Sequence, residues 1–138
     1  MNPASIDIKD LLEQESSSSS SLNLDLEFGT NLFISHEPDS PQNCVTVYDA
    51  PGGFIDSTLQ AGNQDYFYAD VQVRVRNTNY LTGMALACNI QKVLHGLNNF
   101  MHGTTYYAFI RCTTPPFMLE WDTLNRAIII INFQIQRR

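Results

Sequence analysis

The segment Val71-Gln-Val-Arg-Val-Arg76 decides the fold class of this chain of 138 residues. Its three valines alternate with Gln72, Arg74 and Arg76, which is the period-two pattern of a strand with one buried face. The polar face of such a strand must meet solvent or a partner, and two arginines suit an acidic partner. We therefore predict a strand here and name Arg74 and Arg76 as candidate assembly contacts.

Working outward, other strands and two helices are expected. Strands are predicted at 31–35, 44–48, 106–112, 117–121 and 127–136. Helices are predicted from Ser5, as N-cap, to about Glu15, and from Thr78 or Asn79 to about Gly96. This order favours the α+β class, with a mostly antiparallel sheet and helices packed on one face.

Two turns containing proline divide these strands. Pro38-Asp-Ser-Pro41 is expected to join 31–35 to 44–48 as a hairpin, and Pro115-Pro116 is expected to end a strand. Six serines at 16–21 form a predicted flexible tether, because serine competes for backbone hydrogen bonds and buries little. We thus divide the chain into an N-terminal helix with its tether, 1–21, and one α+β domain, 22–138.

A long irregular stretch, 49–68, is interpreted as a contact loop. Loops of this length usually bind something or stay disordered. The loop carries Phe54, Ile55 and Leu59, apolar side chains that a solvated loop does not need. They are candidate assembly contacts; the alternative is that they fold back onto their own domain.

The helix that ends near Gly96 has apolar side chains on two faces. Its core face collects Gly83, Leu86, Ala87, Ile90, Val93, Leu94 and Leu97. The opposite face carries Leu81, Met84, Ala85 and Cys88. A surface helix needs only one apolar stripe, so the second indicates deep burial or a subunit contact.

Charge is scarce and unevenly distributed. Charged residues make up 16 % of the chain, and the net charge is −6. Residues 1–70 hold twelve acidic and one basic side chain, whereas residues 71–138 hold seven basic and two acidic ones. Either the two halves interleave in the fold, or the subunit is bipolar and its acidic surface meets a basic neighbour.

The chain has no motif that predicts catalysis, a cofactor or a metal. Phosphate-binding glycine loops and a nucleophile elbow are absent, and three cysteines and three histidines lack zinc-ligand spacing. Cys112 with His102 is an imaginable thiol pair, but no third group orients it. With an apparent isoelectric point near 4.8, no signal peptide and no long apolar run, we expect a non-enzymatic protein made in a cytoplasm, with no membrane contact and no sequence-specific nucleic-acid binding.

The order of several segments resembles the bacteriophage tail-terminator (tail-completion) proteins, a family of phage minor capsid proteins. The segments are Asn31-Leu-Phe-Ile, Pro38-Asp-Ser-Pro41, Asn43–Asp49, Pro51-Gly-Gly53, Asp70–Arg76, His95-Gly-Leu97 and the closing hairpin. The resemblance covers roughly residues 5–137. The serine tract and the glycine-free turn Asp122–Arg126 depart from the pattern.

The resemblance implies a structural virion protein at the head-proximal end of the tail. Its partners would be further copies in a ring-forming homo-oligomer, usually a hexamer, the tail tube protein and the head–tail connector, with DNA able to pass through the ring. Three alternatives stay open: another phage neck or head-completion protein, a small cytoplasmic enzyme with a cryptic Cys/His site, and a ligand-binding module that uses the aromatic loop.

Overall fold

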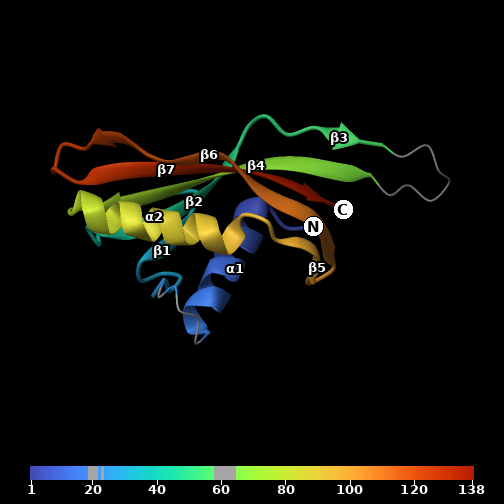
Figure 1. Ribbon diagram of the computed structural model, residues 1–138, viewed down its shortest axis with the longest axis horizontal. Helices are drawn as coiled ribbons and strands as arrows, with labels where there is room; N and C mark the ends of the chain where they lie inside the picture. The colour runs from blue at the N-terminus through green and yellow to red at the C-terminus, as the bar shows by residue number, and fades with distance from the viewer. Residues whose placement is uncertain (19–21, 23, 58–64) are drawn as a thin grey trace.

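The structure, a computed structural model, describes residues 1–18, 22, 24–57 and 65–138. The elements run α1 (Ala4–Ser17), β1 (Leu32–Ile34), β2 (Cys44–Ala50), β3 (Ile55–Asp56), β4 (Tyr66–Asn77), α2 (Tyr80–Leu94), β5 (Asn98–His102), β6 (Thr105–Trp121) and β7 (Ala127–Arg137). Within these described ranges the strands form one sheet in the order β1-β2-β4-β7-β6-β5, with β3 pairing to β4. In Figure 1 both helices lie below the long strands β4, β6 and β7.

The predicted strand at 71–76 is the middle of β4, and its alternation is confirmed. Val71, Val73 and Val75 are fully buried. β4 pairs with β2 on one side and β7 on the other, both antiparallel. Burying the three valines stabilises the fold by about 1.5–3 kcal/mol each, so this ladder anchors the sheet.

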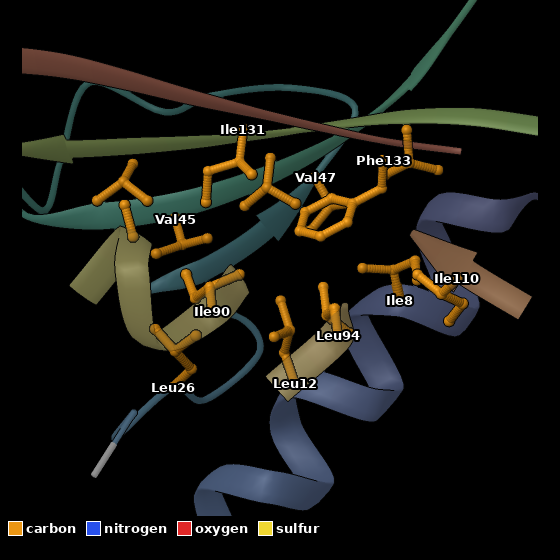
Figure 2. Close-up of a cluster of buried hydrophobic side chains, with 14 of the residues drawn as sticks. Ile8, Leu12, Leu26, Val45, Val47, Ile90, Leu94, Ile110, Ile131 and Phe133 are labelled. Carbon is orange, nitrogen blue, oxygen red and sulfur yellow. The ribbon is translucent and has the colours of Figure 1, made fainter. Parts of the chain in front are cut away.

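The core fills the space between the sheet and the two helices. In Figure 2, Ile8 and Leu12 of α1 and Ile90 and Leu94 of α2 point towards side chains of the sheet. The sheet side chains labelled there are Val45, Val47, Ile110, Ile131 and Phe133. None of the described helices is long and apolar enough to cross a membrane.

The α+β class is confirmed, but the predicted mostly antiparallel sheet with helices on one face is too simple. The sheet is mixed and curled, and the expected hairpin of 31–35 with 44–48 is wrong, because β1 and β2 pair in parallel. Their connection is long enough to reverse direction twice. Two arginines hold it in place: Arg76 of β4 donates to the Pro41 and Gln42 carbonyls, and Arg126 of the β6–β7 turn donates to the Asp39 carbonyl.

Both predicted helices exist, and one of the predicted caps is wrong. Asn79 is the N-cap of α2 and accepts hydrogen bonds from the backbone N–H of Leu81 and Thr82. Ser5 lies inside α1, after Pro3, and its hydroxyl donates to Asp49 at 2.6 Å instead of capping the helix. The helix docks on its own subunit here, and part of the serine tract (19–21) lies outside the described residues.

Pro115-Pro116 does not end a strand, because β6 continues through it to Trp121. Beyond Cys112 the pairing of β6 with β7 shifts register three times. β5 pairs only with the first part of β6, so the prolines stand where β6 has a partner on one side alone. A missing N–H is tolerated on such an edge.

The predicted irregular stretch 49–68 is also shorter than expected. β2 runs to Ala50, and Ile55–Asp56 pairs with the start of β4 as β3. The connection between β3 and β4 includes residues 58–64, outside the described part of the chain, so the predicted contact Leu59 cannot be placed.

Candidate assembly surfaces

The first surface is the arm, which we define as Phe54–Asp56 of the β3 region together with Asp65 and the first three residues of β4, Tyr66–Tyr68. The Phe54 ring stacks on Tyr68, with ring centroids 4.1 Å apart. Phe54 thus folds back onto its own domain, which was the alternative to an assembly contact in the sequence analysis. Phe54 is nevertheless 54 % exposed and Ile55 61 % exposed. The arm thus has a fixed base and an uncovered apolar outer side.

Two glycines allow the arm to lie so close to β4. A Cβ on Gly53 would overlap the carbonyl oxygen of Tyr68, and one on Gly52 would come within 2.6 Å of an Asp70 carboxylate oxygen. The approach is held by the Tyr68 N–H, which donates to the Phe54 carbonyl at 2.7 Å. The motif Pro51-Gly-Gly53 therefore has a steric role.

Arg76, a predicted contact, is buried at 3 % exposure. Its guanidinium donates to the Pro41 carbonyl at 2.7 Å and lies 3.6 Å from a Glu37 carboxylate oxygen. The premise that this face of the strand is exposed is wrong for Arg76, because the 35–43 connection covers it. Arg74 also pairs with Glu37, at 3.5 Å, and its guanidinium lies over the Tyr48 ring.

The second apolar stripe of α2 is divided between the core and the surface. Leu81 is 74 % exposed and Ala85 is exposed. Met84 packs against the core, and Cys88 is half-buried. Of the four predicted contacts on this helix, Leu81 offers the most apolar surface.

A third surface, at the turn joining β6 to β7, was missed by the sequence reasoning. We call it the apolar end. Its exposed side chains are Phe117 (40 %), Met118 (36 %), Leu119 (48 %), Trp121 (49 %) and Leu124 (65 %). The sequence did contain a sign of this surface, because Phe117, Met118 and Leu119 are consecutive apolar residues. In a strand they point to both faces, and only one face can meet the core.

The apolar end and the arm occupy opposite ends of the sheet. In Figure 1 the β6–β7 turn and the start of α2 lie at the left, whereas β3 and the first residues of β4 lie at the right. α2 packs closely against this left end of the sheet at Gly83, where a Cβ would lie 3.0 Å from Ile129 Cδ1. Exposed Leu81 therefore lies at the same end as Trp121.

The acidic and basic halves of the chain interleave in part. Glu37 meets Arg74 and Arg76, and Asp7 lies 3.5 Å from Arg137. These pairs involve three of the seven basic side chains of residues 71–138. Lys92 is exposed on the last turn of α2, and exposed Arg111 donates to the Gln134 side-chain oxygen of β7 at 3.0 Å.

Polar side chains fasten α1 to the sheet. Buried Asp7 accepts a hydrogen bond from the Tyr107 hydroxyl. His102 Nε2 lies 3.8 Å from Asp7 and 3.4 Å from Asp10. Burial, followed by the bond to Asp7, raises the pKa of Tyr107, so the phenol stays a neutral donor. Ligand atoms of these two carboxylates and His102 lie within 4.8 Å of one another, but Asp7 already has protein partners.

Cys112 and His102 are not brought together. His102 pairs with Thr105 at the start of β6, and Cys112 follows Thr105 by seven residues, or about 23 Å of strand. The Cys112 N–H donates to His95 Nδ1 at 2.8 Å, and its thiol donates to the Thr114 carbonyl. Burial raises the pKa of the Cys112 thiol, the opposite of what a thiolate nucleophile requires.

Comparisons with known proteins agree with this architecture. Superposition finds a chain from the virion of a native gene transfer agent particle, with a TM-score of 0.67 and 13 % sequence identity, covering 99 % of this chain and 98 % of that one. At that identity the likeness concerns the fold alone.

No curated protein sequence matches significantly. The family model for bacteriophage tail terminator proteins matches residues 16–138. The chain belongs to the bacteriophage tail terminator family, whose members are structural proteins of the virion.

Proposed function

We propose that this protein is a non-enzymatic tail terminator that forms a ring, most simply a hexamer, at the head-proximal end of the tail. The ring caps the last ring of tail tube protein and presents a new surface to the head–tail connector. The family match over residues 16–138 carries this proposal. The gene transfer agent chain, a virion component with the same fold, supports it.

Two features of the subunit favour a cyclic assembly. Its apolar end and its arm are unlike surfaces at opposite ends of the sheet. Unlike surfaces that bind each other join subunits head to tail, and such a contact makes a ring when the rotation closes. Exposed Leu81 beside the apolar end extends that surface.

Capping a tube requires a ring whose outer faces differ from those of a tube ring. The ring binds the tube on one side and leaves no surface on which a further tube subunit can add. The sequence-predicted contacts Phe54, Ile55, Leu59, Arg74, Arg76, Leu81, Met84, Ala85 and Cys88 divide between this task and ring formation. Arg76 and Met84 serve the fold of the subunit first, because the one is buried and the other packs against the core.

The proposed function is tested by removing the protein from phage. Particles without it should contain tails of uncontrolled length, or tails unattached to filled heads. Wild-type protein should have a native mass several times that of the 15.6 kDa chain. Tails of normal length already joined to heads, with a later step impaired, would instead indicate another neck or head-completion role.

A further inference from the structure

The apolar end exposes apolar side chains on both faces of β6. Exposed fractions of 36–74 % for Leu81 and the five side chains of the apolar end, on residues of about 150–250 Å² each, correspond to about 600 Å² of apolar surface. Met118 pairs with Ile129 on the core face of the sheet and Phe117 with Ile130 on the opposite face, so this area is divided between the two faces. A standard interface buries about 800 Å² per partner, so a partner that covers this area must contact both faces.

The same end has an open sheet edge. β7 pairs with one side of β6 along its length, but on the other side β5 pairs only as far as Phe109. The Cys112 N–H is capped by His95. From Thr113 to Trp121 no described strand pairs with that side. Pro115 and Pro116 lack the N–H that a paired strand donates, so the part of this edge that can accept a strand from another chain is 117–121.

The arm has the complementary chemistry. β3 pairs with β4 on one side, and no described strand lies on its other side. Its outer side combines exposed Phe54 and Ile55 with the carboxylates of Asp56 and Asp65. An apolar segment followed by acidic groups therefore faces outward.

The exposed edge of β6 matches the apolar part of the arm. Phe117, Met118, Leu119 and Trp121 are exposed and apolar, and Glu120 between them is acidic. Ile55 of the arm can therefore meet apolar surface at Leu119. Like charges oppose a register that places Asp56 beside Glu120, so the apolar side chains set the pairing.

The geometry points to a specific contact: the open edge of β6 and the apolar end bind the arm of a second copy of this chain. This inference rests on the proposed ring and specifies its subunit contact. The arm's partner is then the neighbouring subunit and not the tail tube. Because each copy offers one arm and one edge, the contact is head to tail.

Two single variants and their mixture test the contact. Ile55→Asp places a charge on the arm and Leu119→Asp on the edge, both at exposed positions that leave the core intact. Each variant alone should fall from the wild-type oligomer to the 15.6 kDa monomer in native mass spectrometry. Mixed, they should form a dimer, because the intact arm of one variant can bind the intact edge of the other. Phe28→Asp, a 47 % exposed control away from both surfaces, should keep the oligomer.

The outcomes separate this contact from the ring itself. If wild type is oligomeric and either variant stays so, the arm–edge contact is wrong while the ring survives. Two monomeric variants that do not combine would exclude the arm as the occupant of the edge. A wild type that stays monomeric in solution and in particles contradicts both proposals.

Disulfide trapping provides a second measurement. In a background with Cys88→Ser and Cys112→Ser, which leaves buried Cys44 as the one native cysteine, Ile55→Cys with Leu119→Cys in one chain should give a ladder of cross-linked oligomers on oxidation. Each single cysteine alone should give none. Dimers from Leu119→Cys alone would show a two-fold contact between apolar ends, which overturns the proposal.

Discussion

β4 and β6 are the two longest strands described, with 12 and 17 residues, and they use their side chains in opposite ways. In β4 the valines are fully buried, and strands pair on both sides. In the second half of β6 apolar side chains face solvent, and one side has no strand partner. The fold of one subunit accounts for the side chains of β4, whereas it leaves those of the second half of β6 uncovered.

The largest expected effect comes from placing the same charge in each strand. Val73→Asp buries a carboxylate without a partner, and we expect a loss of at least about 4 kcal/mol, sufficient to prevent folding. Leu119→Asp should change the free energy of unfolding by less than about 0.5 kcal/mol. Urea denaturation followed by circular dichroism compares them. Equal losses would mean that the second half of β6 is part of the core.

The next effect separates two arginines of β4 that the sequence treated alike. Arg76→Glu removes the bonds to Pro41 and Gln42 and buries a carboxylate beside Glu37. We expect a loss of about 3–5 kcal/mol. Arg74→Glu also places a carboxylate beside Glu37, but at 31 % side-chain exposure solvent screens the like charges and the loss should be smaller. Denaturant midpoints of the two variants measure the difference, and equal midpoints would contradict the burial of Arg76.

These strands show how far sequence patterns reach. The alternation at Val71–Arg76 and the cap at Asn79 were predictable, because period and capping chemistry are local. The parallel pairing of β1 with β2 was not, since it depends on distant arginines that hold the 35–43 connection. The apolar end was missed because a pattern reports apolar residues without reporting which of them the fold leaves uncovered.

The candidate contacts illustrate the same limit. Phe54 and Ile55 were predicted as contacts and are exposed on the arm. Arg76 was predicted as exposed because its strand alternates, but alternation only assigns a residue to a face. Whether a connection covers that face is a property of the tertiary fold.

A smaller effect concerns the arm relative to the body of β4. Gly53→Ala should push the arm away from β4, because its Cβ would overlap the Tyr68 carbonyl. Overpacking of this kind costs about 1–3 kcal/mol. Hydrogen exchange should therefore accelerate about 10- to 100-fold at the Tyr68 amide, which donates to Phe54. The Val73 amide serves as the internal control. Equal acceleration at both amides would mean that the arm and body open as one unit.

The smallest effect is the acid response of two carboxylates, one in the turn that ends β6 and one in α1, far from that turn in sequence. Desolvation acts to raise the pKa of Asp122, in the β6–β7 turn, but hydrogen bonds from Arg126 and Leu124 outweigh it and hold the pKa below 3.8. Desolvation also acts to raise the pKa of Asp10, in α1, but hydrogen bonds from Lys9 and His102 outweigh it and lower that pKa. A carboxyl with a depressed folded pKa stabilises the fold fully above its unfolded pKa, and this contribution is lost as the pH falls through the folded value.

The melting temperature should therefore decrease on acidification below about pH 4. Asp122→Asn should reduce the steepness of that decrease, and Asp10→Asn should do the same independently, since the two sites share no partner. Thermal melts at a series of pH values check both, and an unchanged slope in either variant would remove that carboxylate from the account.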